Sequence, residues 1–332
     1  MRSGKNGSTL LTEGSILGKL FGFAVPLFLG NLFQQLYNTC DSLIVGNFVG
    51  SEALAAVSSS GSLIFLLVGL FNGIAMGAGV VIARYFGARD PEHMRRAIHS
   101  TVFFGIVAGL ALTVLGILLT PQLLRWMGTP EAVLPQSITY FRVYFAGALA
   151  VVLYNVAVGI LQAVGDSKHP LYYLMISSGV NVVLDLVFVG ALHWGASGAA
   201  AATVIAQGVA FFSAAAFLFL HKEAVQFDFR LRSFAVDREQ LGALCRLGIP
   251  SVVQQFLITI SITFVNAQVN AFDVAASAVD SVGGKLNMVA NIITGAISTA
   301  TATMIAQSFG ARKMGYDSLQ PDQYRILDKR AG

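Results

Sequence analysis

The chain has 332 residues, of which 55% are hydrophobic and only 11% are charged, whereas a soluble globular chain carries about 25% charged residues. A single soluble core stops growing at about 250 to 300 residues and still needs a polar surface. With a mean hydropathy of +0.70, the composition therefore excludes a soluble domain and indicates an integral membrane protein. It also excludes a disordered chain, and two cysteines cannot form a disulfide framework.

Apolar stretches long enough to cross a bilayer, about 20 residues each, follow one another along the chain. They cover residues 19–46, 53–82, 97–120, 137–163, 169–191, 198–220, 247–270 and 277–306. Their length excludes membrane β-strands of about 9 to 11 residues. The sequence therefore predicts an all-α, polytopic membrane helix bundle. The opening segment 1–8 lacks the features of a cleaved signal peptide, so we expect the first span to remain in the mature protein.

Nearly all of the 21 Lys and Arg residues fall in segments on one side of these spans. By the positive-inside rule that side is cytoplasmic. We therefore expect a multi-pass protein of the plasma membrane with a cytoplasmic amino terminus. The net charge of +4 needs no nucleic-acid partner to explain it, because no basic patch interleaved with aromatic residues accompanies it.

The beginning of the chain recurs near its end. The segment Phe86-Gly87-Ala88-Arg89 returns unchanged as Phe309-Gly310-Ala311-Arg312, and Val25-Pro26 returns as Ile249-Pro250. An offset of about 224 residues, reached after an even number of spans, predicts a parallel repeat about an axis along the membrane normal. The repeat unit is expected to hold six helices.

This duplication predicts the domain organisation. We expect an amino-terminal six-helix lobe over residues 1–225, a cytoplasmic linker over 226–246 and the first two helices of a second lobe over 247–312. The polar tail, 313–332, is expected to lie outside the repeat and to be non-family sequence. A full second lobe needs four more helices, so the sequence predicts a second lobe truncated at its carboxyl end.

Two acids lie within predicted spans, Asp41 in the first and Asp185 in the fifth. An acid in the middle of a spanning helix costs about 2.5 to 3.5 kcal/mol, so it is a functional candidate by default. Counted from the outer ends of their spans, both acids and Thr203 lie about 9 to 10 Å deep. Asn181 and Tyr37 stand one helical turn from an acid. We expect these oxygen-bearing side chains to share one pocket.

Two carboxylates in a low dielectric cannot both stay charged without a counter-ion or a proton. Carboxylate, amide and hydroxyl oxygens suit a hard cation. The pattern therefore predicts a site for Na⁺ or for a shared proton. The alternative is that each acid is only a hydrogen-bonding group between helices.

The remaining polar residues predict no catalysis. No nucleophile accompanies a base, and the histidines have no metal-ligand spacing. We therefore expect no enzyme activity, no cofactor and no metal site beyond possible Na⁺. Lys285 lies inside the eighth span, where a cation needs a partner or a water-filled cavity, so it is a candidate for a substrate-cavity position.

Several segments taken together resemble the multidrug and toxic compound extrusion (MATE) family over residues 15–312. They are Asp41-Ser42-Leu43-Ile44-Val45-Gly46, the turn Gly165-Asp166, Asn181-x-x-x-Asp185, the run from Trp194-Gly195 to Ala202-Thr203, and the repeated Phe-Gly-Ala-Arg. The resemblance implies a two-lobed, twelve-helix antiporter that expels cationic or amphipathic drugs in exchange for Na⁺ or H⁺. Its partners are then small-molecule drugs or metabolites and the lipid bilayer, and no other chain is expected to supply the missing helices.

The resemblance also implies roles for individual residues. The positions that match the coupling-cation site are Asp41, Asn181, Asp185 and Thr203; those matching its surroundings or the drug cavity are Tyr37, Tyr140, Asn155 and Gln34. Another subgroup of the family uses acids of the second lobe, including one on the seventh span. The stretch 247–270 contains no acid, so that arrangement is not predicted here.

Two other functions remain open from the sequence. A related flippase for lipid-linked saccharides needs several cations in its cavity, for which Lys285 and Arg142 are the candidates. Alternatively, the chain is a fragment that does not transport, because alternating access requires two lobes that rock against each other.

Overall fold

A computed structural model of the chain describes residues 10–12, 15–49, 76–126, 129, 131, 133–221, 238–272 and 274–311. All structural statements below concern these residues. Most of the expected second span, most of the expected linker and the polar tail lie outside them. Within the described part every regular element is a helix and no strand occurs, which confirms the predicted all-α fold.

The helices follow the predicted spans closely. They are α1 (Ile16–Phe48), the segment Met76–Ala88, α3 (Pro91–Trp126), α4 (Leu134–Ala146), α5 (Ala148–Ala163), α6 (Lys168–Asp185), the π-helix η1 (Leu186–Ala191), α7 (Gly195–Leu220), α9 (Arg238–Phe272) and α10 (Val274–Gly310). Among the described residues, six helices are long and apolar enough to cross a membrane, or seven if α4 and α5 form one bent span.

The predicted fourth and fifth spans are not regular helices. At Gly147 the chain bends by 47° between α4 and α5. A Cβ atom on Gly147 would lie 2.9 Å from the Cβ of Val204 on α7, so the absence of a side chain allows the bend to pack closely. The fifth span changes from α-helix to π-helix directly after Asp185. Short π-helical stretches of this kind are frequent at functional sites.

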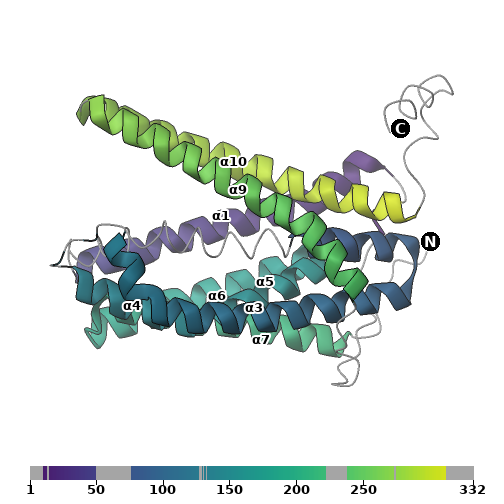
Figure 1. Cartoon of the computed structure of the whole chain (residues 1–332), viewed down its shortest axis with the longest axis horizontal. Coiled ribbons are helices and arrows are strands. Elements are labelled where there is room, and N and C mark those ends of the chain that lie inside the picture. Colours follow the sequence, from purple (N-terminus) through teal and green to yellow (C-terminus); the bar gives the residue numbers. More distant parts are fainter. Residues whose placement is uncertain are drawn as a thin grey trace.

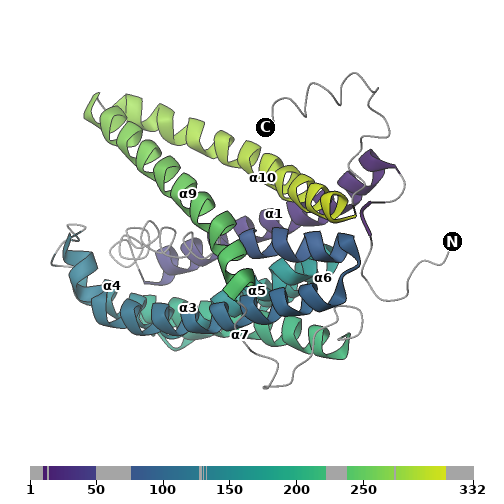
Figure 2. The same ribbon diagram turned by 45° about the vertical axis from the view of Figure 1, so that its right-hand side comes forward.

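Helices α1 and α3 to α7 form one bundle, with α1 against α6, α3 against α5, and α7 against α4, α5 and α6 (Figure 1). Helices α9 and α10 form a hairpin whose tip stands away from this bundle, while the carboxyl-terminal part of α10 lies beside α1 (Figure 2). We call the end of the bundle marked by Lys19, Arg84 and Lys168 the basic end. The end marked by Phe48 and Trp194 is the far end.

Helix α9 begins at Arg238, within the segment expected to be a linker. Its first turns carry buried residues, Gln240 and Leu244, which are each 1% exposed. The Gln240 Nε2 donates a hydrogen bond of 3.1 Å to the Tyr85 hydroxyl. These first turns therefore pack on the bundle, and the tertiary contacts extend the helix beyond the apolar stretch that predicted the span.

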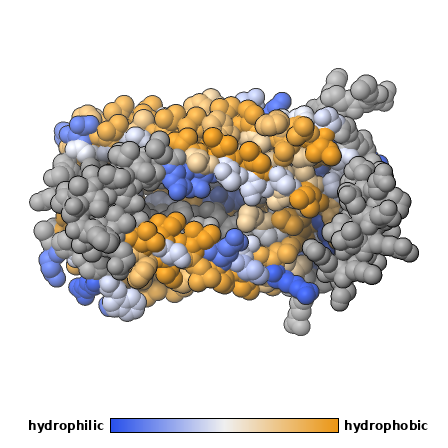
Figure 3. Space-filling view, turned by 90° about the horizontal axis from the view of Figure 1, so that it is seen from above, coloured by the Kyte–Doolittle hydropathy of each residue, from blue (hydrophilic) through white to orange (hydrophobic). Residues whose placement is uncertain are grey.

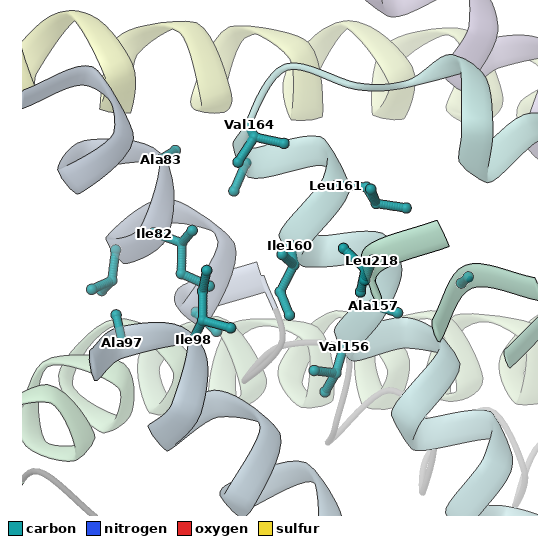
Figure 4. Close-up of a cluster of buried hydrophobic side chains, with 14 of the residues drawn as sticks. Ile82, Ala83, Ala97, Ile98, Val156, Ala157, Ile160, Leu161, Val164 and Leu218 are labelled. Carbon is teal, nitrogen blue, oxygen red and sulfur yellow. The ribbon is translucent and has the colours of Figure 1, made fainter. Parts of the chain in front are cut away.

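The core is divided between the two ends of the bundle. At the basic end, Ile82 packs with Ile98 of α3, Ile160 and Leu161 of α5, and Leu218 of α7 (Figure 4). A second cluster around stacked Phe141 and Phe145 fills the far end. A third lies between α1 and α10, through Phe23, Ala24 and Leu27 of α1 and Ala296, Ala300 and Met304 of α10.

The outer surface of the helices is apolar. Leu118 of α3, Phe212 of α7 and Phe264 of α9 are 67%, 70% and 64% exposed. The face in Figure 3 shows hydrophobic residues along both sides of a central hollow in which polar residues gather. Such a surface cannot face water without driving aggregation, whereas a bilayer solvates it. The protein is therefore a multi-pass membrane protein.

Candidate functional site

The structure brings together the two acids of the predicted site. Asp41 on α1 and Asp185 on α6 interact electrostatically, although their helices are far apart in the chain. Asp185 is fully buried. Both of its carboxylate oxygens, and Oδ1 of Asp41, are buried without a hydrogen-bond partner among the described residues. Buried carboxylate oxygens are costly unless something neutralises or coordinates them.

Asn181 and Thr203 complete this group from two neighbouring helices. Asn181 lies one turn before Asp185 on α6, which places both side chains on one face. Its Nδ2 donates to the Thr203 hydroxyl of α7 at 3.4 Å. That bond turns the carboxamide so that Asn181 Oδ1 is buried with no partner of its own. The group therefore offers carboxylate, amide and hydroxyl oxygens, which is a donor set suited to a hard cation.

Two tyrosines lie close to the acids. The Tyr37 side chain hydrogen-bonds with Gln34 and Gln207 and lies within electrostatic reach of both Asp41 and Asp185. Tyr140 of α4, which is 5% exposed, also lies within reach of both acids. The predicted neighbours Tyr37 and Tyr140 are thus both at the acid pair.

A cavity of about 400 Å³ lies between the bundle and α10. The two acids, Asn181 and Thr203 do not line it, but Gln34, which hydrogen-bonds with Tyr37, does. Gln34 and Asn155, for which the family resemblance implied a place in the cation-site surroundings or drug cavity, both line it. The Asn155 Nδ2 donates to the carbonyl oxygen of Val151 in its own helix at 2.8 Å, which leaves its amide oxygen as an acceptor. The walls come from α1, the segment 76–80, α5, α6 and α10, with Thr299 and Thr303 on the α10 side.

The two cations considered for a flippase are placed differently. Arg142 is exposed on α4 and does not line the cavity. Lys285 belongs to α10, and its side chain lies outside the described residues. Among the described residues the cavity wall contains no Lys or Arg.

Sequence reasoning missed two side chains of the site. Gln207 of α7 is 9% exposed, contacts the Tyr37 hydroxyl and has a buried, unpartnered Oε1. Tyr144 stacks with Tyr140 at 6.5 Å between ring centroids and lies within reach of Tyr37. Gln207 stands four residues after Thr203, and Tyr144 stands four residues after Tyr140. Residues four apart share one face of a helix, so the spacing used for Asn181 and Asp185 also predicts these two side chains.

The described residues contain no group of three His, Cys, Asp or Glu side chains able to hold a metal ion. The oxygen donors that the structure does bring together at the acid pair are the two carboxylates, the Asn181 amide oxygen and the Thr203 hydroxyl.

Comparison with known proteins shows which family the chain resembles. A family model described as MatE matches residues 26–187. The chain is 33% identical over 296 residues to the Probable multidrug resistance protein YoeA of Bacillus subtilis, covering 88% of this chain and 64% of that protein. It is 23% identical over 260 residues to the Multidrug export protein MepA of Staphylococcus aureus, covering 78% of this chain and 56% of that protein. The chain thus spans less than two thirds of either relative.

Solved structures share the fold as well. A MATE protein crystallised in a bent conformation superimposes with a TM-score of 0.85 at 29% identity, covering 91% of this chain and 67% of that one. A transporter of the MOP superfamily from Pyrococcus furiosus gives a TM-score of 0.85 at 28% identity, covering 94% and 69%. The motifs, the fold and these relatives agree: over most of its length the chain is similar to the multidrug and toxic compound extrusion (MATE) family.

Proposed function

We propose that this protein exports drugs or similar small molecules across the plasma membrane in exchange for a coupling cation, Na⁺ or H⁺. The observation that carries the proposal is that Asp41 lies within electrostatic reach of Asp185, while three of their four carboxylate oxygens are buried with no partner among the described residues. Asn181 and Thr203 supply further oxygen ligands, and the cavity beside Gln34 and Asn155 takes the substrate.

The proposed mechanism follows from charge. Without a cation or proton the two carboxylates repel each other in a medium that screens poorly. Binding of the coupling ion draws α1 and α6 together. Gln34 of α1 lines the cavity and hydrogen-bonds with Tyr37, which lies within reach of both acids. A movement of α1 therefore alters the space open to the substrate. Exchange then requires that ion and substrate favour different conformations.

We also propose the topology expected from the sequence. The amino-terminal lobe, 1–225, carries the cation site, and residues 247–312 supply the second-lobe side of the cavity. The basic end then faces the cytoplasm, as the positive-inside rule predicts. Relatives named as multidrug resistance and export proteins, and an exposed Arg142, favour export of drugs over a lipid-linked saccharide.

The proposal is tested by ion-driven ethidium efflux from cells that express the chain. Asp41→Asn and Asp185→Asn are expected to reduce efflux by about tenfold or more, the usual range of coupling between two ligands. Imposing a Na⁺ gradient and a proton gradient separately identifies the coupling ion.

Glu92→Gln is the matched control. Glu92 is an exposed acid at the basic end that pairs with Arg96 at 2.5 Å, so efflux should stay at the level of the unmodified chain. Unchanged ion-driven efflux in the Asp41→Asn variant, at equal protein amount in the membrane, would remove the acid pair from the mechanism.

A further inference from the structure

We propose that the two copies of the repeated Phe-Gly-Ala-Arg segment form a latch that closes the basic end of the cavity. Its members are Gly87 of the first copy, Gly310 of the second copy and Gln307 of α10. The latch rests on the proposed function and adds to it. It names the positioning residues that close one side of the transport path.

The first half of the latch is a contact between backbones. A Cβ atom added to Gly87 would overlap the carbonyl oxygen of Gln307 and would lie 2.6 Å from its carbonyl carbon and 2.7 Å from its Cα. No side chain other than hydrogen fits at this position without moving α10. Gly87 therefore lets the end of the helix Met76–Ala88 touch α10 directly.

The second half repeats this contact with the roles exchanged. A Cβ on Gly310 would overlap the carbonyl oxygen of Arg84 and would lie 2.7 Å from its carbonyl carbon and 3.0 Å from the amide nitrogen of Ala88. Gln307 precedes Gly310 by three residues, as Arg84 precedes Gly87. The two contacts are therefore equivalent: the glycine of each copy lies against the residue that precedes the glycine of the other copy by three positions.

Side chains strengthen the crossing. Gln307 is fully buried. Its Oε1 accepts a hydrogen bond of 2.9 Å from the amide of Leu11, and its Nε2 donates one of 2.8 Å to the carbonyl oxygen of Ala163. The Arg84 guanidinium lies 5.2 Å from the ring centroid of Phe309, a cation–π contact between the two copies.

The latch lies at the boundary of the substrate cavity. Ala163, which accepts the Gln307 hydrogen bond, also lines the cavity, and so does Thr303, one turn before Gln307 on α10. Figure 2 shows α10 running from the tip of the hairpin to this end, where it lies beside α1. Separating α10 from the segment 84–88 therefore opens the cavity toward the basic end.

The hydrogen bonds of Gln307 make the closed arrangement reversible. In the closed arrangement a single carboxamide pairs with the amino-terminal segment at Leu11 and with the end of α5 at Ala163. When α10 moves away, all three groups must find water instead, which the basic end supplies once it opens. The latch can therefore open at modest cost, whereas a tightly packed apolar core could not.

A labelling experiment tests the latch. Gln162, which lines the cavity, is replaced by cysteine in a chain carrying Cys40→Ser and Cys245→Ser, and a membrane-impermeant maleimide is applied from the basic-end side. Gly310→Leu is expected to raise the labelling rate about fivefold or more, since overpacking a close crossing shifts a two-state equilibrium by at least about that factor. Gln307→Leu removes both hydrogen bonds and should raise the rate by a smaller factor.

Gly295→Leu is the matched control. Gly295 lies on the same helix and a Cβ there meets nothing within 4 Å, so its labelling rate should equal that of the unmodified background. If Gly310→Leu and Gln307→Leu are both labelled at the same rate as this control, the latch proposal is wrong. If Gly310→Leu fails to fold, as judged by size-exclusion chromatography, Gln307→Leu alone decides.

This readout uses neither drug nor ion gradient, so it separates the latch from the proposed function. Faster labelling in a chain that moves no ethidium supports the latch and removes the proposed exchange. Ethidium efflux by the unmodified chain, combined with unchanged labelling in both latch variants, supports the exchange and removes the latch.

Discussion

Asp41 on α1 and Asp185 on α6 share one electrostatic environment inside the membrane bundle. Two like charges in a poorly screening interior repel each other, so this arrangement is favourable only when a proton or cation occupies it. Three of the four carboxylate oxygens are buried without a protein hydrogen-bond partner. The pair is therefore suited to a ligand rather than to joining two helices.

Gln207 gives the first prediction. Gln207→Met keeps the length of the side chain and removes the carboxamide that contacts Tyr37. We expect cation binding, measured by calorimetric titration of the purified protein, to weaken about fivefold, because one hydrogen bond contributes about 1 kcal/mol. Tyr37→Phe should weaken it at least as much, because it also removes the hydrogen bond with Gln34. The double variant should then lose no more than Tyr37→Phe alone, since that change already removes the contact with Gln207. Additive losses would contradict a shared role.

Gly147 gives the second prediction, which concerns stability. A Cβ at this bend would lie 2.5 Å from Val204 Cγ2 and 2.9 Å from its Cβ. Gly147→Ala is expected to destabilise the protein by about 1 to 3 kcal/mol through overpacking and to lower the midpoint of thermal unfolding, followed by intrinsic fluorescence. Gly179→Ala on α6 is the control, because a Cβ there meets nothing within 4 Å. Equal midpoints for the two variants would show that the bend tolerates a side chain.

The turn before α3 gives the third prediction. Asp90 Oδ1 accepts a hydrogen bond of 3.2 Å from the backbone amide of His93, and Asp90 Oδ2 lies 2.7 Å from His93 Nδ1. The backbone hydrogen bond is the main cause that lowers the pKa of Asp90 below its ordinary value of 3.8. A lowered folded-state pKa contributes stability above pH 3.8 that is lost as the pH falls through the folded value.

The variant Asp90→Asn tests whether the charged carboxylate of Asp90 stabilises the folded protein. At pH 7 the variant should unfold at a temperature lower by a few degrees at most, because the group is exposed and solvent screens it. The difference between the variant and the unmodified chain should shrink as the pH is lowered below 3.8. A difference that grows toward acid would mean that the charged form of Asp90 is not the stabilising one.

Several features could be predicted from the sequence because they depend on local patterns. The bilayer sets the length of a span, so apolar runs located the helices. Helical spacing placed Asn181 beside Asp185, and counting depth from the span ends placed Asp41 at a similar level. The division into lobes at 225 and 247 stays a prediction, because the segment between them lies largely outside the described residues.

Other features depended on contacts between distant segments. The bend at Gly147 reflects its approach to Val204, and the early start of α9 reflects the contact of Gln240 with Tyr85. In both contacts the two residues are far apart in the chain, so no local sequence pattern predicts them.

The repeated Phe-Gly-Ala-Arg segment has one property that the local sequence sets and another that contacts between distant segments set. The sequence by itself determined that the segment occurs twice and that the chain is a membrane helix bundle with two acids inside predicted spans. Only the tertiary structure decided that Gly87 lies against Gln307 while Gly310 lies against Arg84. The physical reason is that hydrophobic spacing specifies which residues form helices and which faces are apolar, whereas the partner of each face depends on close packing of the whole bundle.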